Sequence, residues 1–185
     1  MNIRNQIVGW AEDLSNRVRS PNRTVRYPIV CMYHSITEKA VRDWGPWKYA
    51  VTPTEFREQI RWLTRNTTVV SIDDLVAYLS GEGSLPKNAA VITFDDGYQD
   101  YVQQAVPVLE EFEVPSTVYV LTQLMEDQIA PYEFRLAEML YQQERVEIEF
   151  DGERIEYDLS GDAETKRAYS EIRRLVKGSA VEARR

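Results

Sequence analysis

Residues 28–122 alternate short apolar runs with amphipathic segments, and this alternation constrains the fold more than any other feature of the sequence. The apolar runs have the length of buried strands, whereas the segments between them carry apolar residues at steps of three and four, which predicts helices. Strands that alternate with helices pair in parallel through right-handed crossovers. We therefore expect an α/β fold, either a doubly wound sheet or a β/α barrel, with strands at 29–33, 69–72, 89–94 and 116–120.

Three helix starts are marked by residues that commonly cap helices. Thr52 and Glu55 form a capping-box pattern around a proline, which fits the first turn of a helix. Asp73 is expected to cap a helix that ends near Gly81, and Asp100 is expected to cap the next one.

The pattern changes after the fourth strand. A helix over 131–143 precedes two runs of alternating apolar and charged residues around Asp151-Gly152, a pair typical of tight hairpin turns. A two-residue turn places Glu149 opposite Arg154, so that apolar residues share one face of the hairpin and this ion pair lies on the other. We interpret this part as an inserted helix plus β-hairpin subdomain, with a last helix over 162–178.

These patterns divide the chain into three parts. Residues 1–27 are expected to form an amphipathic helix and a linker, residues 28–123 the β/α part, and residues 124–185 the inserted subdomain. Ser179 and Glu182 form another capping-box pattern, but only residues 183–185 follow it. A helix start without a helix predicts that the chain stops within a larger architecture, and the alternative is a frayed tail in which Ser-x-x-Glu occurs by accident.

Composition limits the classes of function. Residues 1–90 carry 9 acids and 12 bases, whereas residues 91–185 carry 21 acids and 10 bases. The acidic excess argues against a nucleic-acid partner, because phosphate contacts need clustered Lys and Arg.

A single cysteine, Cys31, excludes an internal disulfide and a cysteine-rich zinc site. No apolar run approaches the roughly 18 residues of a transmembrane helix and no secretory signal is seen, so we expect a cytoplasmic location.

The strand over 89–94 ends in two adjacent carboxylates, Asp95 and Asp96, followed by a glycine. Open α/β sheets and barrels keep their sites at the carboxyl ends of parallel strands. Because consecutive side chains diverge, one carboxylate can bind a divalent metal while the other takes a proton. Asp-Asp-Gly is also an ordinary turn sequence, so the spacing alone leaves a simple turn open.

The segment 91–98, VITFDDGY, resembles the first signature motif of the polysaccharide deacetylase family. Other segments are similar to the family's surroundings of this motif, in the same order: CMYHS at 31–35, VTPTEF at 51–56, and the stretch 107–117. The likeness covers about residues 28–123, and the ordered set is far more specific than Asp-Asp-Gly alone.

The resemblance implies metal-dependent hydrolysis of N-acetyl or O-acetyl groups on a sugar polymer, with an acetylated glycan as substrate. It implies a distorted β/α barrel, of which this chain is expected to be a partial, N-terminal portion. By the family pattern Asp95 is the general base and Asp96 a ligand of the divalent metal, which is zinc in the complete family site.

The family's other two metal ligands lie in a His-x-x-x-His motif, whereas this chain contains one histidine, His34. A zinc site normally takes three protein ligands and a water. The chain by itself is therefore expected to be incomplete and inactive, with the metal either not bound or held with the help of a complementing chain.

His34 and Tyr98 are candidate substrate-side residues. His34 follows the first strand and faces the same rim as Asp96, at roughly 10 Å if one strand lies between them. The alternative for His34 is a satisfied histidine at a strand end. Cys31 is expected to pack in the core rather than to bind metal.

Two other classes of function stay open. A non-catalytic module could bind a glycan or a partner chain, and would melt cooperatively as a monomer. A magnesium-dependent phosphatase could also use neighbouring aspartates, but the haloacid dehalogenase-like enzymes require an Asp-x-Asp spacing that this sequence does not have.

Overall fold

A computed structural model describes residues 28–38, 44–122, 126 and 130–178. The helix expected within 1–27 and the capping-box pattern at 179–182 lie outside the described residues. The chain divides into two compact units: unit 1 comprises Met1–Val41 and Tyr49–Leu121, and unit 2 comprises Arg42–Lys48 and Thr122–Arg185. Within the described ranges, no helix is both long enough and apolar enough to cross a membrane.

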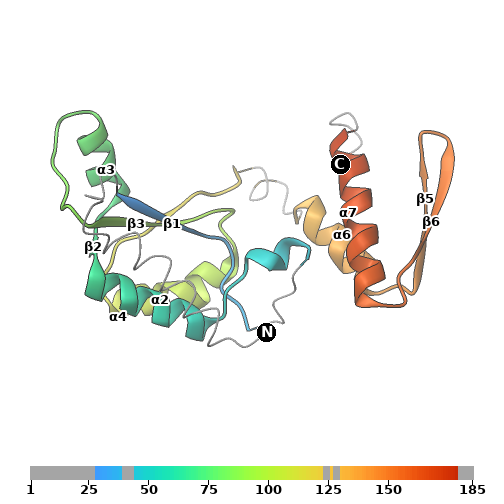
Figure 1. The fold of residues 1–185 in the computed structure, drawn as a ribbon, viewed down its shortest axis with the longest axis horizontal. Coiled ribbons are helices and arrows are strands. Elements are labelled where there is room, and N and C mark those ends of the chain that lie inside the picture. Colours follow the sequence, from blue (N-terminus) through green and yellow to red (C-terminus); the bar gives the residue numbers. More distant parts are fainter. Residues whose placement is uncertain (1–27, 39–43, 123–125, 127–129, 179–185) are drawn as a thin grey trace, which may run out of the picture. The chain divides into compact units, whose positions relative to one another are not determined.

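Unit 1 is built on a parallel sheet with β3 (Ala89–Phe94) in its centre (Figure 1). β1 (Ile29–Tyr33) pairs with β3 along its whole length, and both run in the same direction. On the other side of β3, β2 (Thr68–Val69) pairs with its first residues and β4 (Thr117–Val118) with its last. The predicted α/β fold with parallel strands is confirmed, although β2 and β4 are shorter than expected.

The central strand is buried on both faces, as its apolar sequence AAVITF predicts. Helices α2 (Pro53–Asn66) and α4 (Val106–Glu111) cover one face of the sheet (Figure 1). Side chains from that face and from both helices form the core of unit 1, in which Phe56, Ile60 and Ile92 are fully buried.

The first helix start is confirmed in detail. The Thr52 hydroxyl accepts a hydrogen bond from the Glu55 N–H at 3.2 Å, and the Glu55 carboxylate accepts one from the Thr52 N–H at 2.9 Å. This reciprocal capping box satisfies two of the N–H groups that a helix leaves unpaired at its start.

The second helix start lies two residues before the expected one. Ser71, not Asp73, is the cap of α3 (Ile72–Leu79), because its hydroxyl accepts the Asp74 N–H at 3.1 Å while Asp74 accepts the Ser71 N–H at 3.0 Å. Since Ser71 belongs to this box, the preceding strand ends at Val69. Serine and aspartate are both good caps, and the sequence prediction chose the wrong one.

The third helix start departs further from expectation. Asp100 precedes a π-helical turn, η2 (Tyr101–Ala105), and its side chain makes no capping bond. The Val106 N–H donates to the Tyr101 carbonyl, five residues earlier, and the next residue is a proline without an N–H. The proline removes the donor that would continue a regular ladder, and such single-turn π segments are frequent at functional sites.

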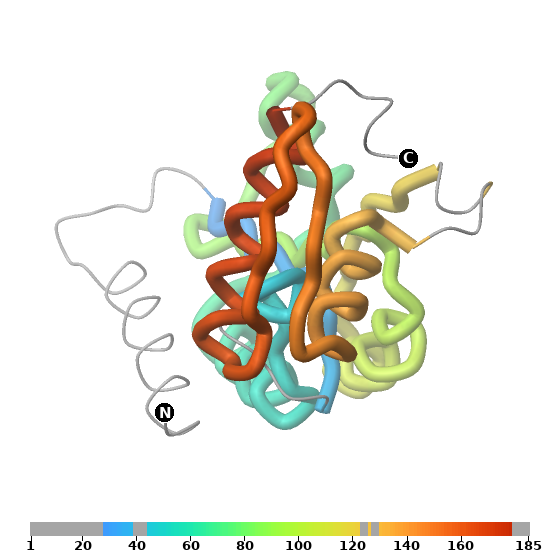
Figure 2. Tube along the Cα trace, turned by 90° about the vertical axis from the view of Figure 1, so that its right-hand side faces the viewer, coloured from blue at the N-terminus to red at the C-terminus, as the bar shows by residue number. Residues whose placement is uncertain are grey.

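Unit 2 contains α6 (Tyr132–Tyr141), the antiparallel hairpin β5 (Arg145–Phe150) and β6 (Glu153–Asp158), and α7 (Asp162–Gly178). The hairpin lies alongside α7 in both views (Figures 1 and 2). Its register is the predicted one, so the hairpin buries its apolar side chains against the helices. The short 3₁₀ helix η1 (Pro46–Tyr49) spans the boundary between the units in sequence.

The polar face of the hairpin differs from the expectation in one ion pair. Glu149 does lie opposite Arg154, but the Arg154 guanidinium pairs diagonally with Glu147 at 3.3 Å. Arg145 pairs in the same diagonal way with Glu156 at 3.1 Å. Glu147 and Glu156 are direct cross-strand neighbours of like charge, and the two diagonal pairs reduce their repulsion.

Candidate functional site

The two adjacent aspartates lie where the central strand of unit 1 ends. Asp95 and Asp96 follow β3 directly and are both half-buried. The Asp95 N–H donates to the Tyr33 carbonyl at 2.9 Å, which extends the β1–β3 ladder by one bond. The carboxylates therefore start from a fixed backbone position at the carboxyl edge of the sheet, the edge where parallel sheets place their sites.

The backbone of this turn is strained. Asp96 has a φ of 72° and Gly97 a φ of 71°, so two consecutive residues occupy the left-handed region. A side chain in that region costs energy because its Cβ approaches the following carbonyl oxygen. The Asp96 carboxylate also accepts a hydrogen bond from the Tyr98 hydroxyl at 2.7 Å. Strain of this kind at a side chain with catalytic chemistry is typical of functional sites.

We expect the strain at Asp96 to be measurable by comparing two variants. Asp96→Ala and Asp96→Gly both remove the bond from Tyr98, but only alanine keeps a Cβ at positive φ. The glycine variant is therefore expected to be more stable than the alanine variant by about 1 kcal/mol. Urea denaturation of both proteins checks this, and equal midpoints would contradict it.

His34 lies closer to the aspartate turn than the sequence indicated. No strand lies between β1 and β3, since Tyr33 is the register partner of Phe94. His34 and Asp95 are therefore the next residues on two directly paired strands. The distance of roughly 10 Å that would follow from one intervening strand does not apply, because β1 pairs directly with β3. The His34 ring stacks on Tyr49, with centroids 5.2 Å apart and planes 22° from parallel.

Asp100 ties two segments of the site together, a role the sequence did not reveal. Its carboxylate accepts a hydrogen bond from the hydroxyl of Ser35, which is 65 residues away in sequence and nearly buried. Burial raises the pKa of Asp100, and the Ser35 hydroxyl opposes this rise together with the backbone N–H groups of Ile36 and Tyr101. In the sequence, the polar residues His34 and Ser35 directly after the first strand indicated a site at that strand end. The residue that Ser35 contacts, Asp100, was instead predicted to cap a helix.

Cys31 packs against the core of unit 1 as expected, and burial raises the pKa of its thiol from 9.0 to about 11. Because only the thiolate is nucleophilic, the folded chain should react with a thiol reagent at pH 8 about a hundredfold more slowly than the unfolded chain. Absorbance assays in buffer and in denaturant measure this ratio for the single cysteine. Equal rates in the two conditions would contradict the burial of the thiol.

A complete zinc site is not formed by the residues that the structure describes. Within those ranges no three His, Cys, Asp or Glu side chains come close enough to share a metal ion. Structural and catalytic zinc sites take at least three protein ligands. The described residues thus do not provide the set of ligands that the metal implied by the sequence motifs requires. The Asp96 carboxylate instead accepts the hydrogen bond from the Tyr98 hydroxyl.

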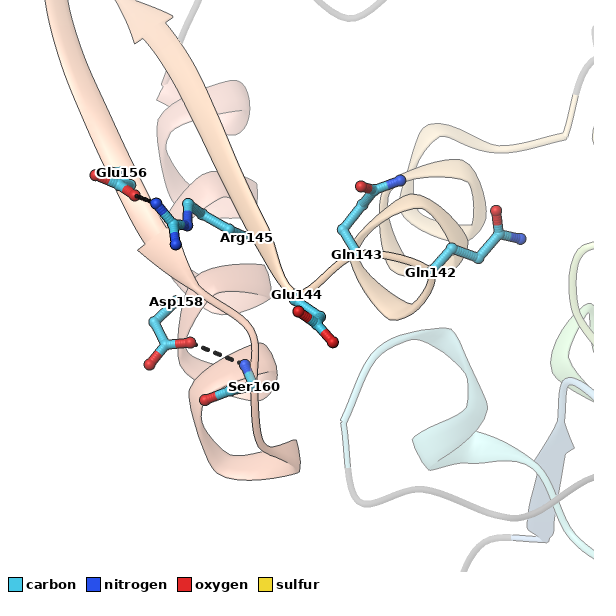
Figure 3. A pocket seen from close by; sticks show the side chains of 7 residues that line it. All are labelled: Gln142, Gln143, Glu144, Arg145, Glu156, Asp158 and Ser160. Atoms are coloured by element: carbon cyan, nitrogen blue, oxygen red, sulfur yellow. Dashed lines mark hydrogen bonds and ion pairs between the residues drawn. The ribbon is translucent and has the colours of Figure 1, made fainter.

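An open polar hollow of about 1030 Å³ lies in unit 2 (Figure 3). It is lined by Gln142, Gln143, Glu144, Arg145, Glu156, Asp158 and Ser160. Two of its charged groups form an ion pair, Arg145 with Glu156, and the Ser160 N–H donates to the Asp158 carboxylate at 2.9 Å. Hydrogen bonds from Ser160 lower the pKa of Asp158. None of the site residues predicted from the sequence lines this hollow.

The sequence profile of the family described as "Polysaccharide deacetylase" matches residues 82–175. The matched range includes the aspartate turn, α6, the hairpin and most of α7, so the likeness continues past residue 123, where the motifs recognised in the sequence end.

Curated relatives match a shorter stretch. The poly-beta-1,6-N-acetyl-D-glucosamine N-deacetylase of Staphylococcus epidermidis is 33% identical over 75 residues, which are 40% of this chain and 26% of that protein. A protein of the same name from Staphylococcus aureus is 28% identical over 75 residues, with the same coverage. The chain thus spans about a quarter of the length of these relatives. Among solved structures, the Streptococcus pyogenes deacetylase PplD in complex with acetate gives a TM-score of 0.47 at 25% identity, over 56% of this chain and 46% of that one.

Proposed function

Because the chain belongs to the polysaccharide deacetylase family, we propose that its aspartate turn is one part of a site that hydrolyses acetyl groups on a sugar polymer. The observation that carries the proposal is the position of Asp95 and Asp96, half-buried, at the carboxyl edge of a parallel sheet and on a strained turn. The names of the curated relatives favour an N-acetylated glucosamine polymer as the substrate.

Asp95 is the general base in this proposal. Water attacks the carbonyl carbon of the acetyl group, and the Asp95 carboxylate takes the proton that the water loses. The bond from the acetyl carbon to the sugar nitrogen or oxygen then breaks, acetate leaves, and a proton passes to the departing amine or alcohol. The bond from the Asp95 N–H to the Tyr33 carbonyl supports this role, because it fixes the backbone from which the carboxylate projects.

Asp96 is proposed as one ligand of a divalent metal. The described residues offer no second and third donor beside it, so the remaining ligands would have to come from elsewhere, including a complementing chain. A single carboxylate binds zinc weakly, since tight sites use three protein ligands. We therefore expect the 185-residue chain alone to be inactive.

We also propose that the parallel sheet of unit 1 is part of a distorted β/α barrel. Apolar side chains at both outer strands support this: Val30 and Met32 on β1 are 52% and 60% exposed, and Tyr119, which follows β4, is 51% exposed. Residues of this kind are usually covered in a finished sheet, and further strands of a barrel would cover them.

Acetate release from a chitin oligomer tests the proposal. In the presence of zinc, the 185-residue chain is expected to release acetate no faster than Asp95→Asn or the matched surface control Asp73→Asn, because the described residues supply no further metal donors beside Asp96. Zinc-dependent release that Asp95→Asn abolishes would contradict the incompleteness while supporting the role of Asp95. Release that survives in Asp95→Asn would contradict the assignment of the base.

A further inference from the structure

An exposed aromatic ring lies beside the histidine that follows β1. Tyr49 is 55% exposed, and its ring stacks on the half-buried imidazole of His34 at 5.2 Å and 22°. One surface of the Tyr49 ring is thus supported by a second ring, while more than half of the side chain remains open to solvent. Single exposed tyrosines are common on protein surfaces, so exposure alone does not indicate a binding site. The position of Tyr49 and its contact with His34 are the evidence that matters.

The backbone holds this stack in place. Ile36 and Val51 form a parallel bridge, and His34 and Tyr49 are the residues two positions before them. Backbone hydrogen bonds of 2.9 and 3.0 Å fix the bridge, and the Ser35 hydroxyl is tied to Asp100. Because both segments are anchored, the two rings need little further ordering when a ligand binds.

The stack is also next to the aspartate turn. Tyr33 and Phe94 are register partners, and His34 and Asp95 are the residues that directly follow them. Neighbouring strands lie about 4.8 Å apart, which is the scale of one sugar ring. His34 lies between Tyr49 and Asp95, so a sugar on the open face of Tyr49 would extend to the aspartates through further rings of the same polymer.

A pyranose ring fits this surface chemically. Its two faces are made largely of C–H bonds, which pack on the electron-rich face of an aromatic ring, and its hydroxyls can bond to the phenol at the edge. We propose that Tyr49, supported by His34, is a stacking subsite for one sugar ring of an acetylated glycan. The inference rests on the proposed function for the class of glycan, and it adds a substrate-binding residue that the sequence motifs do not contain.

Titration of the 185-residue chain with a chitin oligomer tests the subsite. His34 is the only histidine, so its imidazole C–H signals in NMR spectra are assigned without ambiguity. The oligomer is expected to shift these signals, and Tyr49→Ala is expected to weaken binding about five- to tenfold, on the scale of aromatic contacts. Tyr49→Phe keeps the ring and should bind nearly as well as the wild type.

Two further variants complete the design. Tyr141→Ala removes a tyrosine of unit 2 that is 59% exposed, and should leave oligomer binding unchanged. If Tyr49→Ala does not fold, Tyr49→Leu keeps apolar volume without an aromatic face and should show the same loss. The subsite is overturned if the oligomer leaves the His34 signals unmoved, or if a folded variant without the Tyr49 ring binds as well as the wild type.

Failure of the subsite and failure of the proposed function give different results. Oligomer binding that depends on Tyr49 but leaves the amide signals of the aspartate turn unchanged supports the subsite and counts against the proposed function. Shifts at the aspartate turn that persist in Tyr49→Ala with unchanged affinity overturn the subsite alone.

Discussion

Replacing Phe94 with alanine is expected to lower the free energy of unfolding by about 3–5 kcal/mol, the range for large core aromatics. Phe94 is 1% exposed and ends the central strand directly before the aspartate pair. Its ring contacts three others, with centroid distances of 4.8 Å to Tyr101, 5.4 Å to Tyr33 and 5.8 Å to Phe56. Alanine would leave a cavity among these rings, in the part of the core that supports the site.

Chemical denaturation followed by tyrosine and tryptophan fluorescence measures the Phe94 effect. Phe94→Leu is the matched control, because it keeps most of the apolar volume and should cost clearly less than alanine. A loss below about 1 kcal/mol in Phe94→Ala would mean that the site collapses around the deletion or that Phe94 is not central to the core.

Gly97→Ala is expected to destabilise the chain by about 2–4 kcal/mol, for two separate reasons. The glycine has a φ of 71°, where a Cβ is strained, and a methyl group there would collide with Cγ1 of Val120. The Cα of Val120 would lie at 3.5 Å, an ordinary contact, so the collision involves the Val120 side chain alone. The aspartate turn thus packs directly against the side chain of Val120, in the segment after β4.

Two comparisons separate these causes. Gly152 in the hairpin turn has a φ of 80°, and a methyl group added there would meet nothing within 4 Å, so Gly152→Ala measures the backbone strain alone, about 1 kcal/mol. In the double variant Gly97→Ala/Val120→Ala the collision is removed, and part of the lost stability should return. If Gly97→Ala costs no more than Gly152→Ala, the close packing on Val120 is contradicted.

Much of the fold is readable from local patterns in the sequence. The central strand followed from an apolar run, the start of α2 from Thr52 and Glu55, and the hairpin register from Asp151-Gly152. These features depend on neighbours in sequence, where propensity and spacing act directly. The prediction of the α3 cap was wrong because Ser71 and Asp73 are both good caps. Only the reciprocal hydrogen bonds between Ser71 and Asp74 distinguish the two positions.

The site was less predictable because its contacts join distant segments. The aspartate pair stood out locally, but the bond between Ser35 and Asp100 spans 65 residues. The approach of Tyr49 to His34 depends on a single bridge between loops. No periodicity encodes such contacts, since they follow from which strands pair, and the pairing of β1 with β3 was not foreseen.

We propose that the aspartate turn faces the metal of a deacetylase site, and a zinc titration tests this proposal. NMR spectra of the ¹⁵N-labelled chain should show weak, saturable shifts at Asp96 and the residues beside it as zinc is added. Asp96→Asn should abolish these shifts, whereas Asp73→Asn should leave them unchanged. Shifts that are the same in Asp96→Asn and in the wild type, or that appear only elsewhere in the chain, would contradict a metal ligand at Asp96.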